Sequence, residues 1–256
     1  MSNQNIIGYF HICQKEGWQK SFDLIFPVIK SSGLYDATKE IRIGIVNESG
    51  THVIEDERLN DPKFNIIFCK SHQEYERPTL LHLRIHADVD QGNNLYWYVH
   101  SKGISHFGKN NESCIIDWIN YMLYWNIEKW KLAVSILKDY DTYGCDEIKN
   151  LHYSGNFWWA KSSHLKDLPV FIESYYTAPE DYICKKKDKL FNIHSSGLQG
   201  CGHYHHNYSR DNYLIPDDFD IDAYRNINHD LNNFNYKQLM EHWFKYGKYE
   251  SRNYKY

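Results

Sequence analysis

The sequence has no Cys-x-x-Cys pair and no other closely spaced pattern of cysteines. Its six cysteines are scattered along the chain, at Cys13, Cys69, Cys114, Cys145, Cys184 and Cys201. This distribution is typical of free thiols in a reducing compartment rather than of a secreted disulfide framework. The polar start, residues 1–5, also lacks the basic and then apolar pattern of a signal peptide. We therefore expect an intracellular, cytoplasmic protein.

An excess of positive charge is missing as well. Lys and Arg total 29 against 33 Asp and Glu, a formal net charge of −4, so the chain as a whole does not attract nucleic-acid phosphates. There is also no long apolar run, because the most apolar stretch, residues 114–140, is interrupted by charged side chains such as Asp117, Glu128 and Lys131. This stretch predicts two helices rather than a membrane span. We expect neither a nucleic-acid partner nor a membrane span.

The chain does have regular hydrophobic patterns, which alternate in type over its first hundred residues. Apolar and β-branched runs predict four strands, at residues 5–12, 40–47, 64–69 and 95–99. Helical spacing of apolar residues predicts a helix after the first run and another before the fourth. Strands that alternate with helices indicate an α/β fold with one sheet flanked by helices.

The composition changes near residue 217. A chain of 256 residues is long enough for one large α/β domain with its own core. After Asp217 the chain is polar and rich in Asn, and only a few apolar residues such as Tyr224, Leu239 and Trp243 can anchor it. We expect residues 1–216 to form one domain and residues 217–256 to form a small helical appendage.

The strand predicted at residues 95–99 runs directly into His100, Ser101, Lys102 and Gly103. In open α/β sheets ligands bind outside the carboxyl ends of the strands. A His and a Lys beside a Gly at such an end can face an anion, which makes this segment a candidate site. An edge strand followed by an ordinary glycine turn is the alternative.

Two groups of residues have the composition of metal sites. Asp88 and Asp90 form an Asp-x-Asp whose oxygens suit Mn²⁺ or Mg²⁺, although they end a predicted helix, where a solvated turn is the alternative. The second group combines thiol and imidazole, which suit zinc, but its spacing matches no zinc template. It consists of Cys201, His203, His205 and His206.

Two further motifs are candidates for chemistry. Glu180 and Asp181 can supply a general base, because a carboxylate within hydrogen-bond reach can deprotonate a sugar hydroxyl. Acids in the first turn of a helix also complement its dipole, which is the alternative explanation. Residues 154–156, Ser-Gly-Asn, form either a binding loop or a plain turn between two elements.

Taken jointly, these segments resemble a family of glycosyltransferases of the GT-A type, known from bacterial polysaccharide loci and large DNA viruses. The resemblance covers roughly residues 5–205 and is most specific at His100–Gly103 and Ser154–Trp159. The tail is similar to a short helical module that is appended to various glycosyltransferases. The resemblance implies a single GT-A domain, a Rossmann-like mixed sheet flanked by helices.

The resemblance also implies roles for individual residues. Asp181 would be the base of an inverting transfer, with Glu180 in support. The donor nucleotide would lie over the first strand ends, near His11, Gln14 and Asn47. The residues on the acceptor side would be Ser154, Gly155, Asn156 and Trp158.

One departure from the family concerns the metal. Where the family's Asp-x-Asp would end the central strand, this chain has His100, Ser101 and Lys102. The family's late histidine corresponds to His194, with His203 as the alternative. A bound Mn²⁺ or Mg²⁺ would therefore be held by His100 and His194, or by the acidic pair at residues 88 and 90. Lys102 can instead neutralise the diphosphate directly.

We therefore expect a hexosyltransferase that moves a sugar from a nucleotide-sugar donor, first of all a UDP-sugar, to a hydroxyl of a glycan or glycoprotein acceptor. No organic cofactor is expected. A catalytically inactive module that binds a nucleotide or a sugar with the same fold is the alternative. A zinc-dependent hydrolase built on residues 201–206 is a third hypothesis.

Overall fold

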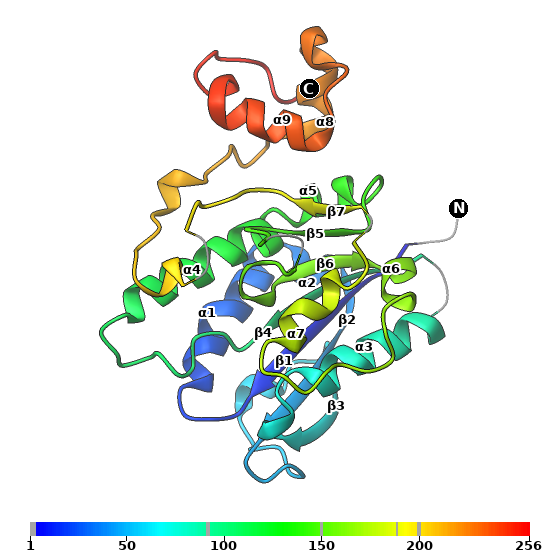
Figure 1. Cartoon of the computed structure of the whole chain (residues 1–256), viewed down its shortest axis with the longest axis vertical. Helices are drawn as coiled ribbons and strands as arrows, with labels where there is room; N and C mark the ends of the chain where they lie inside the picture. The colour runs from blue at the N-terminus through cyan, green and yellow to red at the C-terminus, as the bar shows by residue number, and fades with distance from the viewer. Residues whose placement is uncertain (1–3, 91–92, 149–150, 188, 199–200) are drawn as a thin grey trace.

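A computed structural model describes residues 4–90, 93–148, 151–187, 189–198 and 201–256. These residues form an α/β fold around one mixed sheet of seven strands (Figure 1). The strands are β1 (Ile6–Cys13), β2 (Thr38–Asn47), β3 (Phe64–Ser71), β4 (Leu95–His100), β5 (Thr142–Gly144), β6 (Trp158–Lys161) and β7 (Leu190–Asn192). The predicted α/β class is confirmed, and the four strands of the first hundred residues lie where the apolar runs placed them.

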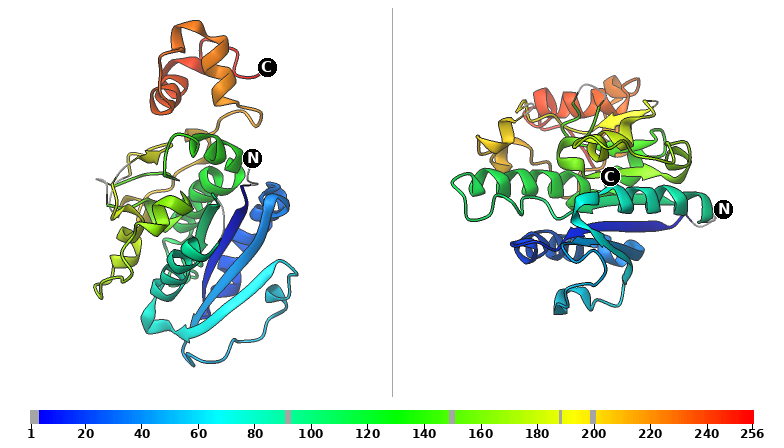
Figure 2. Two further views of the ribbon diagram at one scale, coloured as in Figure 1. Left: turned by 90° about the vertical axis from the view of Figure 1, so that its right-hand side faces the viewer. Right: turned by 60° about the horizontal axis from the view of Figure 1, so that its bottom comes forward.

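Helices cover both faces of the sheet (Figure 2). They are α1 (Trp18–Ser31), α2 (Leu34–Ala37), α3 (Arg77–Val89), α4 (Glu112–Leu123), α5 (Trp130–Ile136), α6 (Ser162–Lys166), α7 (Ala178–Asp181), α8 (Ile221–Ile227) and α9 (Tyr236–His242). The most apolar stretch of the sequence divides into α4 and α5, joined by a π-helical turn at Tyr124–Glu128, so the prediction of two helices is confirmed. Among the described helices, none is both long and apolar enough to cross a membrane.

The strand order is β3-β2-β1-β4-β6-β5-β7. Strands β1 to β4 are parallel to one another, whereas β6 runs antiparallel to both of its neighbours, β4 and β5. The chain moves outward from β1 to β3 and then returns to add β4 on the other side of β1. This reversal places the carboxyl ends of β1 and β4 next to each other, with His11 opposite His100. Such a reversal is where open α/β sheets bind their ligands.

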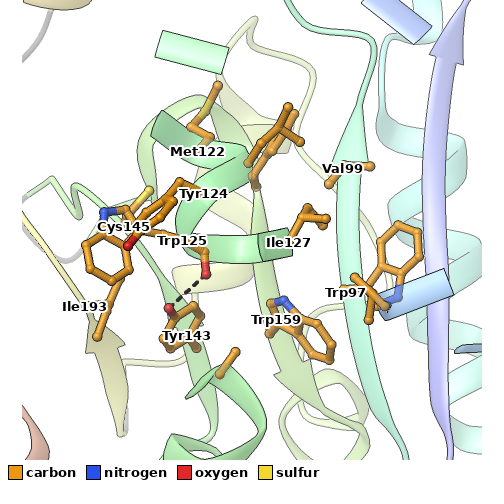
Figure 3. Packing of buried hydrophobic residues seen from close by; sticks show 14 of the residues in the cluster. Trp97, Val99, Met122, Tyr124, Trp125, Ile127, Tyr143, Cys145, Trp159 and Ile193 are labelled. Carbon is orange, nitrogen blue, oxygen red and sulfur yellow. Dashed lines mark hydrogen bonds between the residues drawn. The ribbon is translucent and has the colours of Figure 1, made fainter. Parts of the chain in front are cut away.

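Strand β4 lies in the centre of the sheet and is buried on both faces. Trp97 and Val99 pack into the cluster on the side of α1 and α4, whereas Tyr96 and Tyr98 pack into the cluster on the side of α3. Each such side chain contributes about 1.5–3 kcal/mol through burial. The first cluster is highly aromatic (Figure 3), and within it Tyr143 Oη donates to the Trp125 carbonyl at 2.9 Å. The polar end of β4 therefore stands on a closely packed base.

The C-terminal residues form a small helical unit that contains α8 and α9 and lies near the β7 edge of the sheet (Figure 1). It contacts the rest of the chain through Phe244, whose ring lies 4.8 Å from the His194 ring, and through Asp222, which accepts from Ser135 Oγ at 2.9 Å. A helical tail after residue 217 agrees with the expected appendage. The division into two domains stays a prediction.

Candidate active site at the carboxyl edge of the sheet

The carboxyl ends of β1 and β4 are joined by two hydrogen bonds of Ser101. Its backbone N–H donates to the His11 carbonyl at 2.8 Å, and its Oγ accepts from the Cys13 N–H at 2.8 Å. Beyond these bonds the two chain segments separate, and a hollow of about 490 Å³ lies between them. It is lined by Lys15, Glu16, Gly17, Ile104, Ser105, Phe107 and Lys109. The hollow occupies the crevice that the strand reversal predicts.

The ends of β1 and β2 bound a second hollow of about 360 Å³, which shares two lining residues with the first. Gln14 and Asn47 form its wall and are joined by a bond from Asn47 Nδ2 to Gln14 Oε1 at 3.2 Å. Both amides also hold the following loop, since Gln14 Nε2 donates to the Ile54 carbonyl at 2.8 Å and Asn47 Oδ1 accepts from the Gly50 N–H at 2.9 Å. The structure thus brings these two predicted donor residues together.

His11, the third predicted donor residue, lines neither hollow. Its ring is buried and its Nδ1 lies 2.8 Å from Thr79 Oγ1 on α3. Burial lowers the pKa of His11 to about 4, the charge of His100 acts in the same direction, and Glu76 opposes it. The neutral ring therefore fastens α3 beneath the strand ends.

Lys102 is a buried cation without a partner of opposite charge. Lys102 is only 9% exposed, and its Nζ lies 4.1 Å from the centre of the Trp118 ring. Among the described residues, no carboxylate forms an ion pair with it. Burial lowers the pKa of Lys102, against the opposing influence of Glu180 and Glu76. A buried ammonium in contact with only an aromatic face is suited to receive an anion.

The turn after Lys102 depends on Gly103, which has a φ of +85°. A Cβ atom at this position would lie 2.7 Å from the side chain of Ile115 on α4. Both the left-handed backbone and the close approach of α4 require glycine here. The sequence motif thereby fixes the direction in which the chain leaves β4.

Glu76 is the centre of the hydrogen-bond network beside Lys102, although it was not among the predicted site residues. Its Oε2 accepts from Tyr98 Oη at 3.2 Å and from Asn156 Nδ2. Its Oε1 lies 3.2 Å from His100 Nδ1. Glu76 lies in the connection between the parallel strand β3 and α3. Such a connection begins at the carboxyl edge of the sheet, and this is the signal in the sequence that could have pointed to Glu76.

His100 connects Glu76 to the loop that precedes β6. Its Nε2 donates to the Gly155 carbonyl at 2.7 Å. Burial and the charge of Lys102 lower the pKa of His100 to about 3, while its bond to Gly155 and the charge of Glu180 act in the opposite direction. The imidazole is therefore neutral near pH 7 and carries its one proton on Nε2, where it donates to the Gly155 carbonyl.

The predicted acceptor loop is a compact turn fastened on every side. Gly155 and Asn156 have φ values of +59° and +58°, and a Cβ atom on Gly155 would lie 2.3 Å from the sulfur of Met122. Ser154 Oγ accepts from Trp118 Nε1 at 2.7 Å. Since Trp118 is also the ring beneath Lys102 Nζ, the loop and the lysine share one support.

Trp158 lies below this loop rather than on its surface. Its ring is fully buried, with its centre 5.0 Å from that of Tyr98, and its Nε1 donates to Asn156 Oδ1 at 2.8 Å. The structure therefore places Trp158 as a support for Asn156. The alternation of side chains along β6 turns Trp158 and Trp159 into different clusters, a distinction that two adjacent tryptophans in a sequence do not reveal.

The two acids of α7 face different surroundings. Asp181 Oδ1 lies 3.2 Å from His152 Nδ1, and its Oδ2 accepts from Tyr175 Oη at 3.0 Å. Glu180 is half-buried, and its side chain has no hydrogen-bond or ion-pair partner in the part of the chain that the structure describes. Its charge acts instead on Lys102 and on His100. Of the two acids, Glu180 is the one whose charge raises the pKa of Lys102 against the effect of burial.

The predicted acidic metal site lies at the opposite, amino-terminal edge of the sheet. Asp90 accepts from Arg42 at 2.8 and 3.1 Å and from Tyr96 Oη at 2.8 Å, and Asp88 pairs with Arg84. Because these oxygens are engaged with arginines, the two residues do not fit a divalent cation. The pair forms part of a structural network.

The histidine alternatives for a metal do not fit either. His194 Nδ1 lies 3.0 Å from Tyr121 Oη and its ring is stacked on Trp125, whereas His100 uses its nitrogens on Gly155 and Glu76. Burial lowers the pKa of His194 to about 4, against the effect of Asp146, with Lys248 acting in the same direction as burial. No group of three or more ligating side chains suited to a metal occurs among the described residues.

The cysteine and histidine group of the C-terminal loop is also divided. His203 is buried, with its Nε2 2.8 Å from Asp146 Oδ2, while Cys201 is exposed. His203 is stacked on Trp118, with ring centres 5.3 Å apart. It therefore packs the loop against α4, and the group does not converge on one point as zinc ligands do.

No protein-family model matches the chain, and no curated protein has a matching sequence. Function is therefore inferred from the geometry of the carboxyl edge. That geometry consists of two adjoining hollows together with Lys102 and Glu180, a buried cation and a carboxylate that form no ion pair with any residue the structure describes.

Proposed function

We propose that the chain is a GT-A-type glycosyltransferase, which transfers a sugar from a nucleotide-sugar donor to a hydroxyl of a glycan or glycoprotein. The observation that carries this proposal is the buried, unpaired Lys102 beside the unpaired Glu180, at the end of β4. The strand order supports it, because β3-β2-β1-β4 matches the first four strands of the dinucleotide-binding sheet, whose ligands lie at the reversal. The motif resemblance supplies the reaction class.

In this proposal the nucleoside of the donor lies over the ends of β1 and β2, and its diphosphate lies toward Lys102, which itself lines neither hollow. The two hollows provide space of nucleotide size in total, and Gln14 and Asn47 hold the wall of one of them. Lys102 then stabilises the negative charge that develops on the leaving diphosphate. Such preorganised charge is usually the largest single contribution to catalysis.

The general base in this proposal is Glu180. In an inverting transfer the acceptor hydroxyl gives its proton to the base while its oxygen bonds to the anomeric carbon, and the nucleoside diphosphate leaves with the bonding electrons. The Glu180 carboxylate has no partner within the described part of the chain, whereas Asp181 is engaged with His152 and Tyr175. We therefore assign Asp181, the predicted base, to positioning α7.

A divalent cation is not part of this proposal. The residues at both predicted metal positions are engaged with protein partners and do not fit the ion. Lys102 supplies positive charge at the place where the family's metal would act. The chemistry then needs no further charged group for the diphosphate.

The test is a panel of UDP-, GDP-, CDP- and TDP-sugars, with release of the nucleoside diphosphate and the shift in melting temperature as readouts. A bound donor stabilises the folded state by RT ln(1 + [L]/Kd). Turnover of one donor is the expected result. A donor that stabilises the protein without turnover indicates the inactive binding module, and a panel without turnover or stabilisation contradicts both functions.

A further inference from the structure

An exposed aromatic pair lies at the rim of the candidate active site. Tyr75 is 46% exposed and Tyr176 is 73% exposed, and their rings lie 5.4 Å apart at an angle of 89°. Tyr75 comes from the turn before α3 and Tyr176 from the loop between α6 and α7, so the fold brings them together from distant parts of the sequence. Large exposed aromatic groups on a folded chain commonly mark a binding surface.

Both rings are held in place by the backbone around them. Tyr75 has a φ of +52°, a conformation that is strained for a residue with a side chain. Arg77 fastens the loop of Tyr176 to the start of α3, donating from Nε to the Glu173 carbonyl at 2.9 Å and from Nη2 to the Tyr175 carbonyl at 2.6 Å. The two segments that carry the rings are therefore fastened to each other, and the rings meet edge to face; this pair of rings is called the platform below.

The platform is continuous with the site's carboxylate. Burial raises the pKa of Tyr176, and the charges of Glu180, Tyr75 and Glu76 add to this effect, which places the phenol within electrostatic reach of both glutamates. Glu180 and Glu76 act in turn on Lys102. Tyr75 directly precedes Glu76, which accepts from Tyr98 Oη at 3.2 Å, and the Glu180 N–H donates at 2.9 Å to the carbonyl of Thr177, the residue after Tyr176. Short chain segments thus join the two rings to both carboxylates of the site.

We propose that Tyr75 and Tyr176 form the acceptor subsite and bind the pyranose ring of a neutral saccharide. A pyranose has an apolar face of C–H groups, which packs on aromatic rings, and a rim of hydroxyls, one of which reaches Glu180. Arg77, whose guanidinium lies 5.7 Å from the centre of the Tyr75 ring, is held by the backbone carbonyls of Glu173 and Tyr175, so the carboxylates of Glu76 and Glu180 set the preference for a hydroxyl donor over an acidic sugar. This inference rests on the proposed glycosyltransferase function and narrows its acceptor to a glycan.

The experiment compares Tyr176→Ala with Tyr249→Ala, a matched control because Tyr249 is equally exposed, at 73%, but lies in the C-terminal unit. The acceptors are maltotriose, cellotriose, triacetylchitotriose, trigalacturonic acid and a Ser/Thr-rich peptide. Nucleotide release to water, measured without acceptor, tests the proposed function alone. Absence of nucleotide release with every donor, both without acceptor and with each of the acceptors, overturns that function.

Where release to water occurs, the acceptor readout decides the inference. We expect transfer to a neutral saccharide, and we expect Tyr176→Ala to raise the acceptor KM about tenfold or more. Tyr249→Ala leaves both the acceptor KM and the release to water within about twofold. An unchanged acceptor KM in Tyr176→Ala, transfer only to the peptide or the acidic sugar, or no transfer to any neutral saccharide overturns the inference.

Discussion

The two edges of the sheet each hold a buried cation, and the cations differ in how they are paired. At the amino-terminal edge Arg42 donates to Asp90, to Glu40 at 2.7 Å and to Tyr9 Oη at 3.0 Å. At the carboxyl edge Lys102 has no ion pair among the described residues. A buried charge that is fully paired has a structural role, whereas one that is left unpaired is available to a ligand. The four predictions below test this difference, from the largest expected effect to the smallest.

The largest effect is expected for Glu180→Gln, which removes the base but keeps the shape of the side chain. General-base catalysis typically contributes about 10²–10⁴-fold, so kcat for sugar transfer falls by that factor while donor affinity is kept. Asp181→Asn is the matched control and lowers kcat less than about tenfold. Steady-state kinetics with both variants measures this. If Asp181→Asn is the more damaging change, Asp181 is the base.

At the opposite edge, Arg42→Leu is expected to destabilise the fold. It leaves the carboxylates of Asp90 and Glu40 without their cation, a change that costs about 3–5 kcal/mol in buried pairs. Urea unfolding measures the loss, and nucleotide affinity of the folded fraction stays the same. A decrease in the free energy of unfolding below about 1 kcal/mol would contradict this expectation, because it would show that water solvates the two carboxylates as it does at exposed ion pairs.

Buried neutral histidines are common to both edges, and they make stability depend on pH. Because the pKa of His11 is about 4 in the folded chain and 6.5 when unfolded, the unfolded state binds more protons between these values. The contribution of His11 to the free energy of unfolding is therefore fully present above pH 6.5. It decreases toward pH 4, by about 1.4 kcal/mol per pH unit for a fully buried histidine.

His82, at the amino-terminal edge, also has a pKa lowered to about 4, first by burial and then by His86 and Arg42. Its ring is partly exposed, so His82→Gln should reduce the slope of stability against pH less than His11→Gln does. Urea unfolding at a series of pH values between 4 and 7 measures both slopes. Equal slopes in all three proteins would contradict this assignment.

The smallest effect on stability is expected for Lys102→Met. The variant loses the contact between the ammonium and Trp118, about 0.5–2 kcal/mol, but it also removes the cost of burying a charge. The free energy of unfolding should stay within about 1 kcal/mol of the original value. A loss comparable with that of Arg42→Leu would show that Lys102 is also a structural cation.

The elements could be predicted from the sequence because their hydrophobic periods are clear. In β4, Leu95 to Val99 is apolar throughout, as a strand buried on both faces requires, and its polar end at His100 predicted the edge that carries the site. The three-residue strands β5 and β7 carry too few residues to show a period. Their place in the sheet depends on pairing with β6 and with each other.

The site was only partly predictable because it is assembled by tertiary contacts. The residues that Glu76 contacts are far from it in the sequence, and only the packing of α3 brings it to Tyr98 and His100. Glu180 and Asp181 are adjacent in the sequence, yet the rotation between consecutive residues of a helix directs their side chains toward different neighbours. Asp90 lay in a recognisable motif, but its partner Arg42 is on another strand.

The most direct test of the unpaired cation is a calorimetric titration of UDP, in the presence of EDTA, into the original protein and into Lys102→Met. We predict that UDP binds the original protein without a divalent cation, and that the variant binds it about tenfold more weakly or worse, as expected for the loss of hydrogen bonds to a charged group. Equal affinity of the two proteins for UDP, or binding only after Mn²⁺ is added, would contradict the role of Lys102.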